Sequence, residues 1–91
     1  MDLQWTAQAT SDVTRLHGFL VAANPGAAAR TVQALIAAPW RLRGQPRLGE
    51  RLDEFDPREV RRILVGHYEM RYEIHASALY VLRVWHTREN R

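Results

Sequence analysis

The residues best suited to chemistry stand near the end of the sequence, where a histidine lies among arginines. His86 follows Arg83 by three positions and precedes Arg88 by two. Cleavage of RNA needs a group that moves a proton near neutral pH and cations that hold the phosphate. His86 can supply the first, and Arg83, Arg88 or Arg71 the second. We favour a simpler interpretation, in which His86 ends a strand and donates a hydrogen bond, because the sequence shows no partner for it.

The other histidines and the carboxylates predict neither a metal site nor an acid pair. His17, His67 and His75 lack the i, i+4 spacing of a helix and the i, i+2 spacing of a strand that bring two ligands to one face. Glu69 and Glu73 share one face of a predicted strand, but they lie two pleats apart and fit better as partners of arginines on neighbouring strands. The sequence also lacks a phosphate-binding glycine loop. We therefore expect no cofactor.

Composition predicts one domain, residues 1–91, with a basic surface. The chain has no cysteine and a net charge of +3, and all 13 of its basic residues are arginine. Arginine pairs with carboxylate or phosphate through two parallel hydrogen bonds, which favours an acidic or nucleic-acid partner. A genome rich in G and C, with an ordinary solvated surface, explains the composition equally well. Because the sequence shows no signal peptide and no membrane-spanning run, we expect a cytoplasmic protein.

Four aromatic residues are interleaved with the arginines of the C-terminal half. They are Tyr68, Tyr72, Tyr80 and Trp85. Such interleaving can stack nucleic-acid bases, or it can form one half-buried face of a sheet. We favour the second interpretation for Tyr72, because it alternates with Met70 and Ile74.

The elements that position these residues begin with a short strand, residues 3–6, and two helices. Apolar residues recur at three- and four-residue steps over residues 7–23, which predicts an amphipathic helix with Asp12 off its apolar stripe. Asn24 is predicted to cap a second helix, with Pro25 in its first position. Pro39 is expected to stop that helix at about residue 38. The short break between the two helices predicts that they form an antiparallel helical hairpin.

Residues 39–57 predict an irregular connection, because they contain three prolines and two glycines. We expect its large apolar residues to hold it to the core and its arginines to point to water or to a partner. The expected anchors are Trp40, Leu48, Leu52 and Phe55, and the outward arginines are Arg41, Arg43, Arg47 and Arg51.

After residue 60 the apolar residues recur at every second position rather than every third or fourth. This pattern predicts an antiparallel meander of three strands, residues 62–65, 68–74 and 79–86. In the middle strand, Tyr68, Met70, Tyr72 and Ile74 fall on one face. The order of elements predicts an α+β fold, in which the helical hairpin packs on one face of an antiparallel sheet.

Together these segments resemble the RelE/ParE superfamily, the toxins of type II toxin–antitoxin systems, and they are closer to its ParE branch. The resemblance covers the first strand, the hairpin broken at Asn24-Pro25, the connection rich in proline and glycine, and residues 60–74 and 79–88. It implies a toxin that arrests growth and an antitoxin whose acidic, partly helical tail neutralises it. RelE-like members cleave mRNA in the ribosome, whereas ParE-like members poison DNA gyrase and are not nucleases.

Departures from the RelE-like pattern favour gyrase inhibition. RelE-like nucleases often have an arginine three residues before the tyrosine that matches Tyr72, but this chain has Glu69, and a carboxylate there would repel a phosphate. They also use lysines, which this chain lacks, and many have a tyrosine where it has Glu89-Asn90-Arg91. The alternatives are ribosome-dependent RNA cleavage and an inert member that only binds its antitoxin.

The resemblance also implies which residues meet the partners. For the target we predict a binding surface made of Arg61, Arg62, Arg83, His86, Arg88 and Arg91. For the antitoxin we predict Val13, Leu16, Leu20 and Trp85. In the nuclease alternative the catalytic candidates are His86, Arg83, Arg71 and Arg88.

Overall fold

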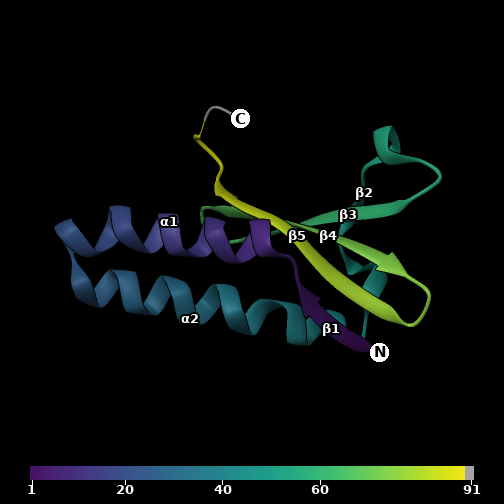
Figure 1. The fold of residues 1–91 in the computed structure, drawn as a ribbon, viewed down its shortest axis with the longest axis horizontal. Coiled ribbons are helices and arrows are strands. Elements are labelled where there is room, and N and C mark those ends of the chain that lie inside the picture. Colours follow the sequence, from purple (N-terminus) through teal and green to yellow (C-terminus); the bar gives the residue numbers. More distant parts are fainter. Residues whose placement is uncertain (90–91) are drawn as a thin grey trace.

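The computed structural model describes residues 1–89, which form two helices and a five-stranded sheet (Figure 1). The elements in chain order are β1 (Asp2–Trp5), α1 (Ala7–Ala23), α2 (Pro25–Leu42), β2 (Glu50–Arg51), β3 (Glu59–Val65), β4 (Tyr68–His75) and β5 (Ala78–His86). Short 3₁₀ turns at Pro46–Leu48 and Asp53–Phe55 flank β2. The predicted α+β class, the helical hairpin and the C-terminal meander are confirmed, and β2 was not predicted. No helix within residues 1–89 is long and apolar enough to cross a membrane.

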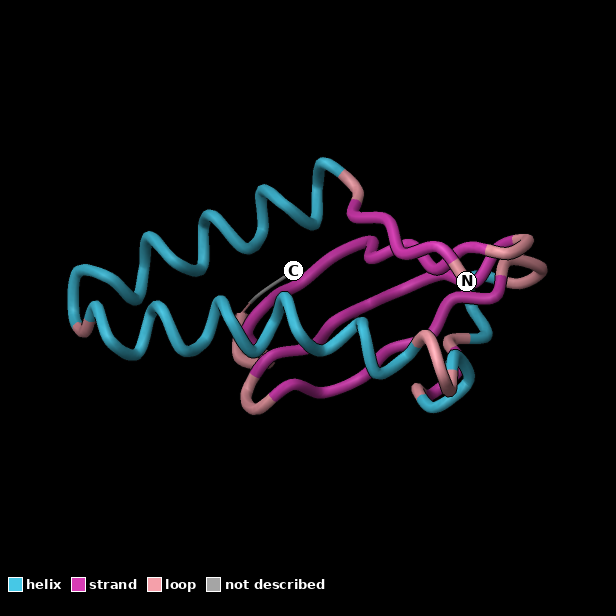
Figure 2. Tube along the Cα trace, turned by 90° about the horizontal axis from the view of Figure 1, so that it is seen from below, coloured by secondary structure: helices cyan, strands magenta, loops and turns pink. Residues whose placement is uncertain are grey.

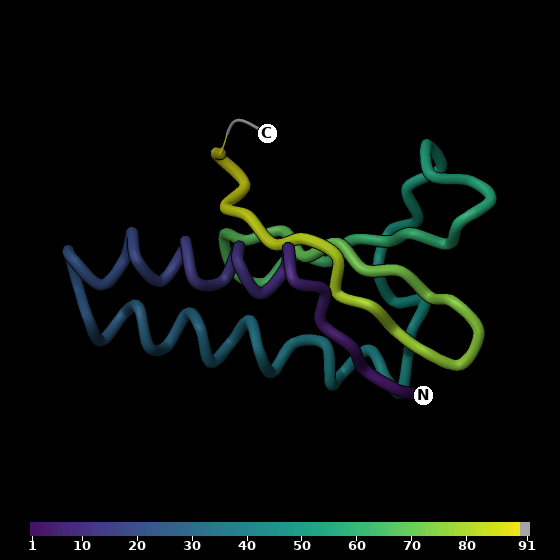
Figure 3. The backbone as a smooth tube through the Cα atoms, viewed as in Figure 1, coloured from purple at the N-terminus to yellow at the C-terminus, as the bar shows by residue number. Residues whose placement is uncertain are grey.

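The sheet is mixed rather than antiparallel throughout. Its strand order is β1-β5-β4-β3-β2, and only β1 runs parallel to its neighbour within the described chain. Asp2 lies opposite Ala78 and Trp5 lies opposite Val81, so the first and last strands are side by side (Figure 3). The prediction of an antiparallel sheet is therefore wrong for this pair, because alternation along one strand carries no information about the direction of its neighbour.

Thr6 fixes the parallel arrangement at the point where β1 passes into α1. Its hydroxyl lies 3.0 Å from the carbonyl oxygens of Val81 and Leu82, and its oxygen accepts the N–H of Ala9 at 3.1 Å as the N-cap of α1. Since one side chain joins β5 to the first turn of the helix, α1 begins beside β5 and continues along it in the same direction.

The two helices form the predicted hairpin around Asn24. The backbone N–H of Asn24 donates to the carbonyl of Leu20 at 2.8 Å, and its side-chain oxygen accepts the N–H of Ala27 at 3.0 Å. One residue therefore closes α1 and caps α2, with Pro25 first in α2 as predicted. In Figures 1 and 2 the connection between the helices lies well beyond the ends of the strands, so the sheet does not cover that end of the hairpin.

The second helix runs to Leu42, and the prediction that Pro39 ends it is wrong. Proline removes one helical hydrogen bond and normally kinks or breaks a helix. Here Ala38, Pro39 and Leu42 are all buried, so the last turn is held by its packing on the rest of the molecule. Arg43 caps the C-terminal end of the helix, and its N–H donates to the carbonyl of Trp40 at 3.3 Å.

The core lies between the hairpin and one face of the sheet. Its largest fully buried members are Leu35 and Leu42 from α2, Met70 and Tyr72 from β4, and Leu79, Val81 and Val84 from β5. Tyr68 and Ile74 pack against this cluster, so the predicted apolar face of β4 is confirmed. A register shift between Arg71 and Tyr72 interrupts the pairing of β4 with β5.

The connection between α2 and β3 is held by a buried tyrosine rather than by all of the predicted anchors. The Tyr72 hydroxyl donates to the carbonyl of Pro46 at 2.6 Å and accepts the N–H of Gly49 at 3.0 Å. Trp40 and Leu48 are exposed, at 55% and 60%, so their predicted role is wrong. The predicted anchors Leu52 and Phe55 are half-buried. The tyrosine that does the anchoring lies 23 or more positions away in the sequence, which no local pattern indicates.

Candidate functional site

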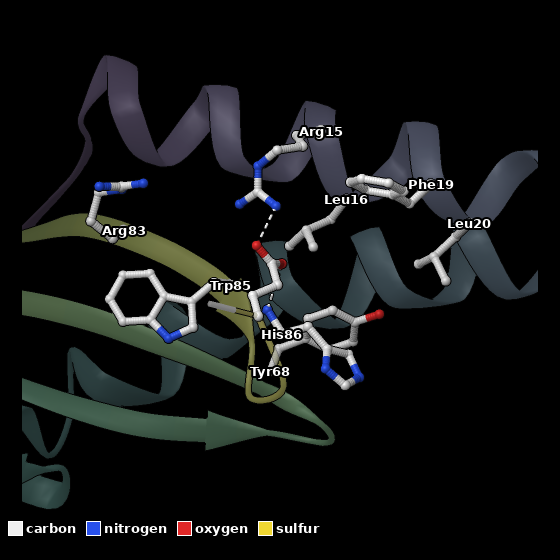
Figure 4. Close-up of a pocket in the computed structure, with 9 residues that line it drawn as sticks. Arg15, Leu16, Phe19, Leu20, Tyr68, Arg83, Trp85 and His86 are labelled. Atoms are coloured by element: carbon white, nitrogen blue, oxygen red, sulfur yellow. Dashed lines mark hydrogen bonds and ion pairs between the residues drawn. The ribbon is translucent and has the colours of Figure 1, made fainter. Parts of the chain in front are cut away.

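A groove of about 570 Å³ runs between α1 and the ends of β4 and β5 (Figure 4). Its wall is mostly apolar and comes from Leu16, Phe19 and Leu20 on α1 and from Tyr68 and Trp85 on the strands. The remaining lining residues are polar or charged: Arg15, Arg83, His86 and Glu89. The groove lies next to the part of the hairpin that extends past the sheet, and Phe19 is 70% exposed there.

Asp12 joins α1 to β5 behind this groove. One of its carboxylate oxygens accepts the Val84 N–H and Arg83 Nε, each at 2.8 Å, and the other accepts guanidinium groups of Arg83 at 3.2 Å and Arg15 at 3.3 Å. Burial raises the pKa of Asp12, but the hydrogen bonds from Arg83, Val84 and Arg15 outweigh it, so the pKa lies below its ordinary value. Asp12 was predicted to lie off the apolar stripe. It is 4% exposed and lies on the packed face, where the Val84 N–H and the guanidinium groups of Arg83 and Arg15 donate to its buried oxygens.

Arg15 and Glu89 close the polar end of the groove. The guanidinium of Arg15 lies 2.6 Å from one carboxylate oxygen of Glu89, and the other oxygen accepts the backbone N–H of His86 at 2.9 Å (Figure 4). Burial raises the pKa of Glu89, but these two contacts outweigh it and leave the pKa below its ordinary value. The carboxylate of Glu89 is therefore charged at neutral pH.

His86 is held in place by contacts with its neighbours. Its Nδ1 accepts the backbone N–H of Arg88 at 3.1 Å, and its ring meets Tyr68 edge-on at 5.2 Å and stacks with His67 at 6.1 Å. Because Nδ1 accepts a hydrogen bond, a proton on the neutral ring lies on Nε2. The guanidinium of Arg83 turns to Asp12 instead of to this ring.

The remaining target and catalytic candidates lie on or near the sheet, and carboxylates or aromatic rings accompany them. Arg61 is bonded to Glu59 at 2.9 Å and has a side chain only 14% exposed. Arg62 bridges Glu50 at 2.7 Å and the buried Glu69 at 3.0 Å.

Arg71 lies between two rings, 5.0 Å from Phe55 and 4.7 Å from Trp85. Arg91 lies outside the described residues. The candidates within residues 1–89 thus occupy several separate places, and of these the groove brings together Arg83 and His86.

The residues predicted to meet an antitoxin divide between core and groove. Leu16 and Trp85 line the groove but are each only 4% exposed, whereas Val13 and Leu20 are half-buried. Sequence reasoning missed Phe19, whose position three residues after Leu16 on α1 was the available signal. It also missed Arg15 and Glu89, because their contact joins positions 74 apart. No group of three or more histidines and carboxylates within residues 1–89 is placed to hold a metal ion.

Comparison with known proteins agrees with this geometry. Residues 3–91 match the family model of the ParE toxin of the type II toxin–antitoxin system parDE. The fold is similar to a solved structure described as the chromosomal ParDE toxin–antitoxin system from P. aeruginosa, with a TM-score of 0.79 and 20% sequence identity. The match covers 94% of this chain and 95% of that one. No curated protein sequence matches the chain significantly.

The fold and the family match together place the chain in the RelE/ParE class of toxins. The match over nearly the whole chain specifies the branch: the chain belongs to the ParE family of type II toxin–antitoxin toxins. Membership of a parDE system implies an antitoxin partner.

Proposed function

We propose that this toxin arrests growth by inhibiting DNA gyrase and that its antitoxin neutralises it. The observation that carries the proposal is the ParE family match over residues 3–91, because ParE-like members of the superfamily are gyrase poisons. The family match also predicts that the toxin works by binding rather than by catalysis.

The placement of the arginines supports a binding mechanism over RNA cleavage. A nuclease must direct cations at the phosphate that reacts and must hold a proton-transfer group beside them. Arg83 is committed to Asp12, and Arg71 lies between Phe55 and Trp85. Glu69, buried at 3% exposure on the same sheet face, accepts a hydrogen bond from Arg62 at 3.0 Å, so Arg62 is engaged as well. Two of the three arginines predicted as catalytic partners of His86 are therefore engaged by other groups.

The groove supports neutralisation by an antitoxin segment. It offers apolar side chains along α1 and cations at one end, which complements an acidic, amphipathic helix or strand. We place the antitoxin against Leu20 and Phe19, with Leu16 and Trp85 forming the floor beneath it. The predicted contact at Val13 would lie outside this groove, in a separate hollow beside Trp5 and Ile36.

Plasmid supercoiling by purified gyrase, with ATP and the antitoxin-free toxin, tests the target. We expect loss of supercoiling or trapped broken DNA, and we expect the antitoxin to reverse it. Arg88→Gln should weaken inhibition, with the difference from wild type shrinking as salt rises, since an exposed charge is screened. Arg30→Gln, on the exposed side of α2, is the matched control. Unaffected gyrase at toxin concentrations that stop growth would refute the proposed target and direct attention to mRNA on translating ribosomes.

A further inference from the structure

The polar end of the groove already contains a carboxylate, and it comes from the toxin itself. Glu89 follows β5 in a turn in which its N–H donates to the carbonyl of His86 at 2.9 Å. The turn directs the Glu89 carboxylate back toward α1, where it lies 2.6 Å from Arg15. An acidic side chain thus occupies the cationic end of a groove whose other walls are apolar.

The ion pair between Glu89 and Arg15 can be replaced by another ion pair at little cost in free energy. The side chains are 31% and 36% exposed, and ion pairs with that access to water contribute little net free energy. Arg15 does not need Glu89 to keep its place, because its other guanidinium nitrogen contacts Asp12 at 3.3 Å and the carbonyl of Val84 at 3.4 Å. A second carboxylate can therefore replace Glu89 on a guanidinium that stays in position.

We infer that Glu89 is an internal stand-in for an acidic side chain of the antitoxin, which displaces it from Arg15 while apolar side chains of the same segment fill the groove. The inference rests on the proposed antitoxin partner and names the contact that the partner makes. Charge complementarity identifies the occupant: the site already holds a carboxylate at its cationic end, and its remaining length accepts apolar side chains from Phe19 to Tyr68. Glu89 competes with the antitoxin and so lowers its affinity.

The binding experiment measures by calorimetry how the wild-type toxin and four variants bind the antitoxin encoded beside the toxin gene. Glu89→Gln removes the competing charge and is expected to tighten binding about two- to fivefold, the range of a partly exposed ion pair. Arg15→Gln removes the receiving cation and is expected to weaken binding about tenfold. Once Arg15 is replaced, adding Glu89→Gln should bring no further gain. Glu54→Gln, the same charge change at an exposed position outside the groove, should leave the affinity unchanged.

A second readout follows the Glu89 carboxyl directly and does not depend on the variants. In the free toxin, its contacts with Arg15 and His86 hold the pKa below the ordinary value despite burial. On displacement the contact with Arg15 is lost, so NMR titration of the Glu89 side-chain carbon should give a higher pKa in the complex than in the free toxin.

The outcomes separate the inference from the proposed partner. Antitoxin that binds wild-type toxin while Glu89→Gln has equal or weaker affinity, or while the pKa of Glu89 stays low, overturns the inference alone. No binding to wild-type toxin overturns the partner, and the inference with it. If Glu89→Gln instead raises affinity for a short DNA duplex and leaves antitoxin binding unchanged, Arg15 receives phosphate and the inference is wrong. Whether the toxin inhibits gyrase does not change how these binding measurements are interpreted.

Discussion

Replacing Asp12 by alanine is the most informative test of how the two halves of the fold are joined. The change removes the acceptor of the Val84 N–H and of two arginine side chains at a position only 4% exposed. A buried N–H without a partner costs about 1–3 kcal/mol. The Arg83 side chain is 46% exposed, so water can solvate its guanidinium once Asp12 is gone. Loss of this ion pair therefore costs less than breaking a fully buried pair, which costs about 3–5 kcal/mol.

We expect Asp12→Ala to lower the free energy of unfolding by about 2–3 kcal/mol. In a domain of this size that lowers Tm by about 10–20 °C. Asp12→Asn keeps an oxygen for the Val84 N–H and should lose less. Urea unfolding followed by tryptophan fluorescence measures both variants, and Thr10→Ala, an exposed position on the same helix, is the control. A loss below about 0.5 kcal/mol for Asp12→Ala, the usual range for surface changes, would refute the role assigned to this carboxylate.

The lowered pKa of Asp12 predicts how the free energy of unfolding changes with pH. The pKa of Asp12 is lower in the folded protein than in the unfolded chain, so its charged form stabilises the fold above the unfolded value. That stabilisation is lost as pH falls below about 4, toward and through the folded pKa. Wild-type stability should therefore fall more steeply in this acid range than that of Asp12→Asn. Parallel curves for the two proteins would contradict the assignment.

Two further variants test other parts of the structure. Gly49→Ala would place a Cβ atom 2.5 Å from the carbonyl oxygen of Arg62 and 2.7 Å from the Tyr72 hydroxyl, so it should lower unfolding free energy in urea by about 1–3 kcal/mol. Gly44→Ala, whose nearest atom is 3.9 Å away, is its control, and equal stabilities would be inconsistent with the close approach. Phe19→Ala should leave stability within about 0.5 kcal/mol, because the side chain is 70% exposed, yet weaken antitoxin binding measured by calorimetry. Unchanged affinity would remove Phe19 from the interface.

The spacing of apolar residues predicted the helices and strands well where each element buries one continuous apolar stripe. The helical hairpin, the cap at Asn24 and the alternation of β4 all follow from local patterns that the fold keeps. Pro39 shows the limit of this reasoning, because burial of Ala38 and Leu42 outweighs a local helix breaker. Trp40 and Leu48 show the opposite error, since a large apolar residue does not have to be buried.

The site was less predictable because its contacts join distant positions. Arg83 was chosen as a free cation, but Asp12, 71 positions away, engages it. The composition predicted arginines that could bind an acidic or nucleic-acid partner. In the fold, several of them are instead paired with carboxylates of the same chain, as Arg62 is with Glu69. A polar residue on a helix face that is otherwise apolar, as Asp12 is, was the available signal that a buried pair exists.

The pairing of β1 with β5 has a consequence for the order of events during synthesis. Thr6 bonds the carbonyl of a residue 76 positions later, so β1 and the start of α1 have no completed sheet to join until β5 has been made. Closing so long a segment makes this a late step of folding. Before β5 has been synthesised, neither the groove nor the link through Asp12 can form, because both need residues of β5. The groove and the link through Asp12 therefore form in the same step, when β5 takes its place between β1 and β4.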